Sequence, residues 1–95
     1  MKISGRFLRV AGEPLGAFPC PCCRFFTLDE QPPGTYEICA ICGWEDDPVQ
    51  FEDPDYRGGA NRPSLNEWRH TFETQELPAL RKDGFNFPPR AETPA

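Results

Sequence analysis

Four of the five cysteines form two pairs with the same internal spacing. Two residues separate the thiols within each pair and fifteen residues separate the pairs, which are Cys20 with Cys23 and Cys39 with Cys42. A short loop with this spacing can place two thiolates on one metal ion, so two such loops can complete a tetrahedral shell of sulfur ligands. The spacing therefore predicts a metal site formed by four thiolates.

A shell of four thiolates leaves no coordination position for water or substrate, which is typical of structural rather than catalytic zinc. We therefore expect one structural Zn²⁺ per chain and no catalytic residue. Iron can occupy the same sulfur geometry, so the ligand set leaves the choice between zinc and iron open.

The fifth cysteine, Cys22, lies inside the first loop. An odd number of cysteines argues against a framework built only from disulfides. Cys22 is either a reactive thiol or a small side chain tolerated in the loop, and the absence of an apparent activating base favours the second reading. Cys-Pro-Cys-Cys is similar to the dithiol motif of glutaredoxin-like enzymes, but that motif needs a following helix, whereas residues 24–28 are typical of a strand.

Charge and hydropathy limit the location and the partners. The first residues are followed by no long apolar run, so we expect neither a signal peptide nor a membrane span, and we expect a cytoplasmic protein with reduced cysteines. The net charge is −5 and the pI is about 4.8, which disfavours binding to nucleic acid because phosphates would be repelled.

The residues around the cysteine loops predict strands. Residues 6–10 fit a short strand, and residues 24–28 and 35–38 fit two more, separated by a turn at Pro32-Pro33-Gly34. The expected arrangement is a β-hairpin of residues 24–28 and 35–38 that brings both cysteine loops to one end.

A helix is expected at about 64–76. Ser64 and Glu67 fit a capping box, apolar residues follow at helical spacing, and Pro78 ends the pattern. We therefore predict a small metal-stabilised α+β fold: a zinc-ribbon-like β-hairpin with an acidic loop and one C-terminal helix. The expected organisation is an N-terminal extension (1–17), the folded domain (18–77) and a Pro-rich mobile tail (78–95).

Residues 44–56 form an acidic segment that contains no basic residue, and its two prolines argue against a regular helix. Its carboxylates are Glu45, Asp46, Asp47, Glu52, Asp53 and Asp55. A solvated loop is the commonest role for such a segment, but it could also dock a basic protein partner or hold a second metal ion for hydrolysis. Trp68 on the helix becomes a further interface candidate if it is exposed, whereas His70 is expected to be an exposed helix residue.

Several runs of residues between 19 and 72 together form a specific set: Cys20-Pro21-Cys22-Cys23, Thr27-Leu28-Asp29-Glu30, Gly34 to Cys39, Cys42, Trp44 to Gln50, Asp53-Pro54-Asp55, Gly58 to Asn61, and Ser64-Leu65. This set resembles the cysteine-rich CPCC family of small, mainly bacterial proteins. The resemblance implies a zinc-ribbon-like module and no particular activity. The chain departs from the family pattern at Arg24, where glycine is typical, and at Trp68, where a small residue is common.

Taken together, the sequence predicts a non-enzymatic protein-interaction module that carries structural zinc. One specific form is an inhibitor or immunity-type protein whose acidic surface covers a basic active site. The alternatives are a hydrolase that uses the acidic residues with a second metal, and a nucleic-acid-binding zinc ribbon.

Overall fold

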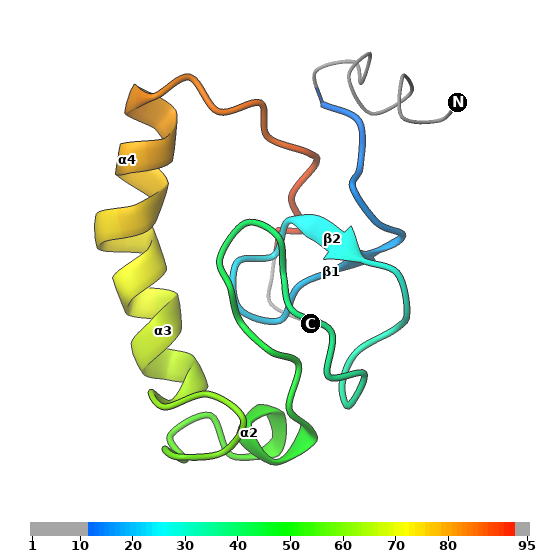
Figure 1. Cartoon of the computed structure of the whole chain (residues 1–95), viewed down its shortest axis with the longest axis vertical. Coiled ribbons are helices and arrows are strands. Elements are labelled where there is room, and N and C mark those ends of the chain that lie inside the picture. Colours follow the sequence, from blue (N-terminus) through cyan, green and yellow to red (C-terminus); the bar gives the residue numbers. More distant parts are fainter. Residues whose placement is uncertain (1–11, 93–95) are drawn as a thin grey trace.

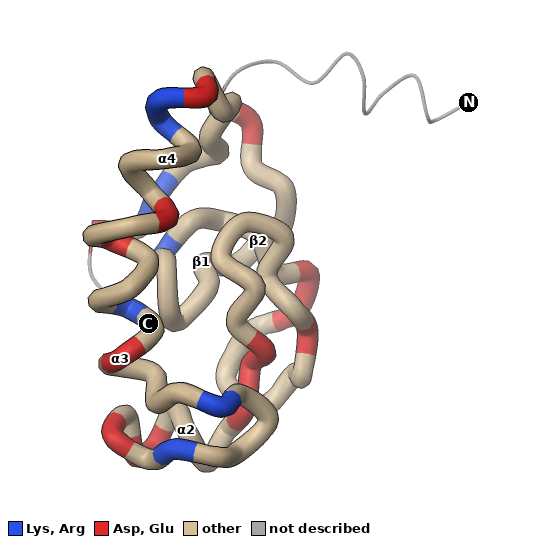
Figure 2. The backbone as a smooth tube through the Cα atoms, turned by 60° about the vertical axis from the view of Figure 1, so that its left-hand side comes forward, with Lys and Arg blue, Asp and Glu red and all other residues tan. Residues whose placement is uncertain are grey.

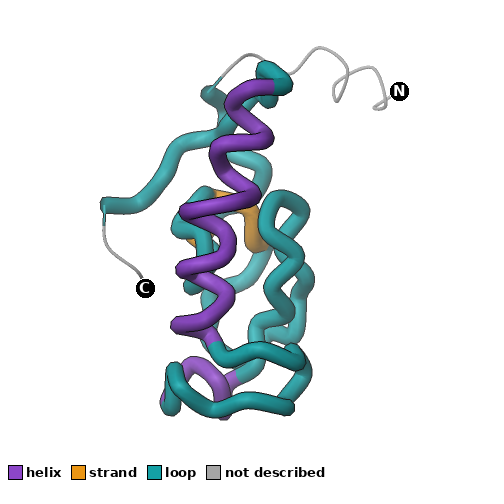
Figure 3. Tube along the Cα trace, turned by 90° about the vertical axis from the view of Figure 1, so that its left-hand side faces the viewer, coloured by secondary structure: helices purple, strands orange, loops and turns teal. Residues whose placement is uncertain are grey.

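The computed structural model describes residues 12–92. The strand expected at residues 6–10 lies outside this range. One long helical rod stands beside the two cysteine loops, and the chain after the helix returns across the strands (Figure 1). Figure 3 shows that most of the chain apart from this rod is loop. Within residues 12–92, no helix combines the length and apolar character that a membrane crossing requires.

Each cysteine loop is flanked by its own short antiparallel pairing. Strand β1 (Phe18–Pro19) pairs with β2 (Phe26–Leu28) around the first loop, and an isolated bridge between Ile38 and Glu45 closes the second. The expected strand near residues 24–28 is present as β2. The expected pairing with residues 35–38 is wrong, because β2 pairs with β1 instead. The loops are tight turns that reverse the chain, so the nearest partner of each flank is the flank on the other side of the same loop.

The described residues after the helix, which were expected to form a mobile tail, contact β2 and the first cysteine loop. The Phe26 N–H donates to Pro89 O at 3.0 Å, and the Ala91 N–H donates to Arg24 O at 2.8 Å. The Phe87 ring stacks on Phe25 with 4.9 Å between ring centroids. The segment that contains Phe87 to Ala91 therefore covers the edge of β2 that β1 leaves open. Its ring and backbone contacts join residues distant in sequence, so no local pattern predicted them.

The helix begins where it was expected and continues further. Segment α3 (Leu65–Thr71) starts with a complete capping box, in which Ser64 and Glu67 each accept a backbone N–H from the other. A π turn, η1 (Phe72–Glu76), then leads into α4 (Leu77–Lys82).

Pro78 therefore does not end the helix. A proline removes one helical N–H and its ring crowds the carbonyl four residues earlier. Immediately before Pro78 the hydrogen bonding widens, because the Leu77 N–H donates to Phe72 O, five residues back. A π turn relieves such crowding without breaking the rod.

A short helix, α2 (Pro48–Glu52), interrupts the acidic segment, which was expected to be irregular. Pro48 occupies the first turn, where its missing N–H costs nothing, and Asp47 caps the end by accepting the N–H groups of Val49 and Gln50. The Asp-Pro pair starts a helix here instead of preventing one.

One core lies between the helical rod and the cysteine loops. Its apolar members are almost fully buried, and the cysteines belong to the same cluster: Phe25, Leu28, Trp44, Leu65, Phe72 and Leu77 with Cys20, Cys22, Cys23, Cys39 and Cys42. The cysteines lie within this one small core, so a metal ion bound by them would cross-link it and add to the stability of the fold.

Candidate metal centre

The four cysteines predicted as ligands converge on one point. Their Sγ atoms all lie within 4.8 Å of one another, and all four side chains are buried. The Sγ atoms of Cys20 and Cys42 are 3.7 Å apart, as are those of Cys23 and Cys39. A tetrahedron with metal–sulfur bonds of about 2.3 Å has sulfur–sulfur edges of about 3.8 Å, so the site fits a tetrahedrally bound ion. A disulfide would need about 2.05 Å, and the thiols are free.

The two loops have the same backbone geometry. The Arg24 N–H donates to Cys20 O at 2.8 Å, and the Gly43 N–H donates to Cys39 O at 3.0 Å. Both loops end in the left-handed conformation, with φ of 71° at Arg24 and 81° at Gly43. Arg24 therefore takes the shape that glycine takes in the other loop, although the sequence left that shape open.

This conformation costs a residue with a side chain about 1–2 kcal/mol. Arg24 offsets it through its guanidinium, whose Nη1 donates to Ala91 O at 3.0 Å and to Glu92 O at 2.7 Å. The departure from glycine thus connects the first loop to the returning C-terminal segment.

Backbone N–H groups point at the sulfur atoms, as expected for loops that hold thiolates. Cys39 Sγ receives most of these contacts: the N–H groups of Ile41 and Cys42 lie at 3.4 and 3.5 Å, and the Thr27 hydroxyl lies at 3.1 Å. Hydrogen bonds from the thiols of Cys20 and the other two predicted ligands lower the pKa of Cys39. Hydrogen bonds with the thiols of Cys20, Cys22, Cys23 and Cys39 raise the pKa of Cys42. A cation bound by the four ligands would stabilise them as thiolates.

Three side chains distant in sequence hold the backbone of the two loops. Arg69 donates to Pro21 O through Nε at 3.1 Å and Nη2 at 2.9 Å. Arg90 donates from Nε to Cys23 O at 2.8 Å, and Trp68 donates from Nε1 to Cys42 O at 2.8 Å. The helix and the tail thus support the metal loops directly. No pattern in the sequence indicated this role for Arg69 or Arg90.

Two features that the sequence left open are settled by this packing. Trp68 is half-buried, packs against the core and donates a hydrogen bond to the second loop, so its ring contributes to the stability of the fold. Cys22 is only 4% exposed and belongs to the core cluster, which agrees with a tolerated small side chain.

Two of the six predicted partner-binding carboxylates are buried. Asp46 is 1% exposed and accepts from the Thr35 N–H and hydroxyl through Oδ2; its Oδ1 has no hydrogen-bond partner within the described range 12–92. Asp47 is 5% exposed. Burial alone would raise the pKa of Asp47, but N–H groups of Ala60, Val49 and Gln50 hold it below its usual value. These two side chains are turned into the loop and stabilise it, so they offer little surface to a partner.

The other four acidic residues remain accessible, with Glu52, Asp53 and Asp55 exposed and Glu45 half-buried. Within residues 12–92, the acidic side chains do not join any group of three or more close enough to share an ion, whereas the four cysteines do.

Sequence reasoning missed Gln50. This residue of α2 is fully buried, and its side chain bonds to the loop that follows the helix. Its Nε2 donates toward the carbonyl oxygens of Tyr56, Asn61 and Pro63 at 3.0–3.1 Å. Its Oε1 accepts from the backbone and side-chain N–H groups of Asn61, both at 3.0 Å. A glutamine between two apolar positions of an acidic segment gives no signal for such a role.

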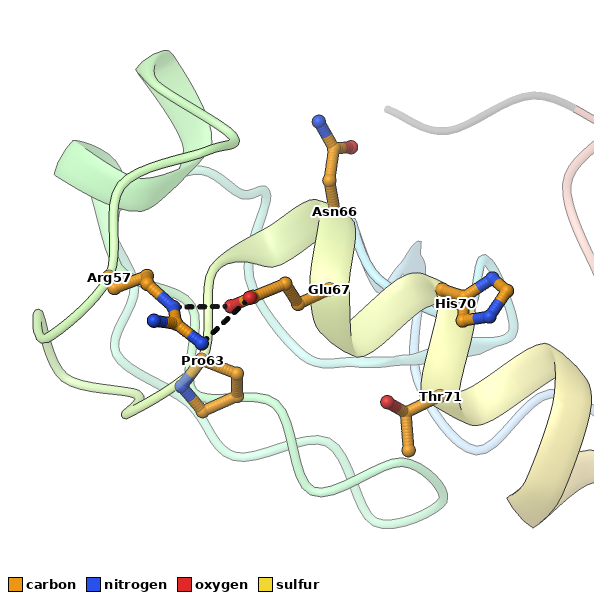
Figure 4. A pocket seen from close by; sticks show the side chains of 6 residues that line it. All are labelled: Arg57, Pro63, Asn66, Glu67, His70 and Thr71. Atoms are coloured by element: carbon orange, nitrogen blue, oxygen red, sulfur yellow. Dashed lines mark hydrogen bonds and ion pairs between the residues drawn. The ribbon is translucent and has the colours of Figure 1, made fainter.

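An open groove of about 570 Å³ lies between this loop and the start of α3. Arg57 and Glu67 form an ion pair across it, with 2.9 Å between Nη2 and Oε2, and His70 lines its far end (Figure 4). His70 is exposed, as expected. The ion pair satisfies both charged groups, and the groove contains no serine or cysteine that His70 could activate.

The comparisons with known proteins agree with this geometry. Residues 18–84 match a family model described as cysteine-rich CPCC. The match covers more than half of the chain and includes both cysteine loops, α2 and the helical rod. No curated protein matches the sequence.

Proposed function

The chain belongs to the cysteine-rich CPCC family, and from that premise we propose that it is a small structural-zinc protein that acts as a non-enzymatic protein-interaction module. The observation that carries the metal assignment is the tetrahedral spacing of four buried thiols. Zinc is the ordinary occupant of a closed four-thiolate shell in a reducing compartment, so we place the protein in the cytoplasm.

Metal analysis of the purified protein tests the zinc assignment. We expect about one zinc per chain, and loss of bound metal in Cys39→Ser because a serine hydroxyl is a poor ligand for this ion. Cys22→Ser is the matched control, because it removes a buried thiol from the same loops without removing a predicted ligand. Unchanged zinc content in Cys39→Ser would refute the ligand set, and iron in place of zinc would correct the metal.

The interaction role is supported by the remaining accessible carboxylates, Glu45, Glu52, Asp53 and Asp55, and by the net charge of −5. Such a surface favours a basic protein partner, and an inhibitor or immunity-type protein that covers a basic active site is the specific form we propose.

Binding to a basic nuclease such as barnase, measured by isothermal titration calorimetry at low salt, tests this charge-driven role. We expect weak, salt-sensitive binding that falls in Glu52→Gln/Asp53→Asn. Glu76→Gln, an exposed helix position, is the matched control. Equal binding by the double variant and the wild type would argue against the acidic surface.

A further inference from the structure

Three exposed apolar side chains lie along two segments that run side by side. Tyr36, Ile38 and Val49 are 53%, 66% and 54% exposed, the highest values among the large hydrophobic residues of the described chain that are exposed. We call these three residues the apolar patch. Ordinary surface apolar residues are scattered singly, so a group of this kind points to an interaction site.

Hydrogen bonds hold these two segments together. The Tyr36 N–H donates to Asp46 O at 3.0 Å, and the Asp46 N–H donates to Glu37 O at 2.9 Å. Ile38 bridges Glu45, and α2, which carries Val49, begins two residues after Asp46. The three residues of the apolar patch therefore come from two segments that backbone hydrogen bonds hold side by side.

The backbone at Tyr36 is strained. Its φ is 58°, in the left-handed region that bulky residues avoid at a cost of about 1–2 kcal/mol. The ring is nevertheless 53% exposed. Residues that the surrounding structure holds in this backbone region cluster at functional sites.

Ile38 also offers backbone groups to a partner. The hydrogen bonds beside it join Cys39 to Trp44 and Asp46 to Glu37, so Ile38 and Glu45 form the non-hydrogen-bonded pair of the ladder. In such a pair the residue's own N–H and C=O face away from the ladder. An extended peptide could therefore pair with the chain at Ile38.

The surroundings of the apolar patch are acidic. Between residues 25 and 56 the chain contains no lysine or arginine, and apart from the buried Asp46 and Asp47 it carries seven acidic residues, namely Asp29, Glu30, Glu37, Glu45, Glu52, Asp53 and Asp55. Figure 2 shows the acidic positions along the chain from β2 to α2, with no basic position in that stretch. A partner must therefore supply positive charge around its apolar contact.

We propose that the apolar patch docks an extended segment of a partner protein that carries an aliphatic or aromatic anchor flanked by lysine or arginine. This inference rests on the proposed interaction role and specifies its surface and its partner class. The anchor buries Tyr36, Ile38 and Val49, and the flanking cations face Glu45 and Glu52.

A second copy of this chain is a poorer occupant. In a symmetric dimer the same patch meets itself, so each acidic rim would face another acidic rim. Such like-charge contact opposes association, whereas a basic segment is attracted.

Selection from a random peptide library displayed on phage tests the proposal. The bait is the metal-loaded protein, and the counter-bait is Tyr36→Ser/Ile38→Ser/Val49→Ser, checked for unchanged metal content and circular dichroism. We expect enriched peptides with an apolar anchor and at least two lysines or arginines. Enriched peptides without basic residues, or no enrichment over the counter-bait, would overturn the proposal.

Titration of one enriched synthetic peptide then locates the contact. Ile38→Ser should weaken binding about 30-fold, as expected for an interface anchor, whereas Leu15→Ser, an exposed apolar residue before β1, should not. If Glu52→Gln/Asp53→Asn weakens binding and Ile38→Ser does not, the patch is wrong while the acidic surface stands. If neither Ile38→Ser nor Glu52→Gln/Asp53→Asn weakens binding, both the apolar patch and the acidic surface are wrong. A dimer of the wild type that Ile38→Ser dissociates would assign the patch to a second copy and overturn the proposal.

Discussion

Replacing Gln50 by methionine tests whether the loop after α2 is held by a single buried side chain. Methionine has a similar volume and shape but cannot donate or accept these hydrogen bonds. The amide nitrogen of Gln50 carries two N–H groups, so at any moment it satisfies two of the three carbonyls of Tyr56, Asn61 and Pro63. With the N–H of Asn61, three backbone groups therefore lose a partner.

The magnitude follows from this count. A buried polar group left without a partner costs about 1–3 kcal/mol, and the lower end applies here because much of residues 55–60 is exposed and water can reach it. We therefore expect Gln50→Met to lower the free energy of unfolding by about 3 kcal/mol, a large fraction of the about 5–15 kcal/mol that holds a typical domain.

Urea unfolding at a fixed excess of zinc measures this difference, because metal binding to the native state contributes to the apparent stability. The fluorescence of Trp44 and Trp68 reports the transition. Gln75→Met is the matched control: Gln75 is an exposed helix residue, so its replacement should change stability by less than about 0.5 kcal/mol. A loss below about 1 kcal/mol in Gln50→Met would refute the reasoning, since the backbone groups would then be adequately solvated.

Three further predictions concern the metal loops and the buried acid. Removing the metal with a strong chelator should unfold the domain, seen as loss of helical circular dichroism, because the core is small and the cysteines form its centre; a fully folded metal-free protein would contradict this. Trp68→Phe should retain zinc but lose about 1 kcal/mol in urea unfolding, since it removes the hydrogen bond to Cys42 O; lost zinc would show instead that this bond positions a ligand. The pKa of Asp47 is lowered in the folded state, so the stability that this carboxylate contributes is present above its unfolded pKa and is lost as pH falls through its folded pKa. In Asp47→Asn the free energy of unfolding should therefore fall less steeply below about pH 4 than in the wild type. An equal slope in both proteins would contradict this assignment.

The parts of the fold that depend on few neighbouring residues were predictable. The spacing of Cys20, Cys23, Cys39 and Cys42 indicated a common site, and the structure brings these four thiols together. The Ser64–Glu67 pattern located the start of the helix, because a capping box is complete within four residues. The end of that helix was predicted wrongly, because a proline ends a helix only if no local widening of the turn accommodates it.

The candidate interaction surface was only partly predictable. The sequence showed that residues 44–56 are acidic, but it could not show that Asp46 and Asp47 point inward to Thr35 and Ala60. Nor could it show that Tyr36 takes a left-handed backbone conformation while its ring remains half exposed. Both facts depend on how separate segments meet.

By itself, the sequence determined the four thiols, the helix start and the charge of the protein, because each is set by local spacing or composition. Only the tertiary structure decided which strands pair, and that Arg69 and Arg90 hold the backbone of the first cysteine loop from 48 and 67 residues away. The physical reason is that these contacts join single backbone carbonyls to single side chains. Any exposed arginine could make such a bond, so the partner is fixed only when packing brings the two groups within hydrogen-bond distance.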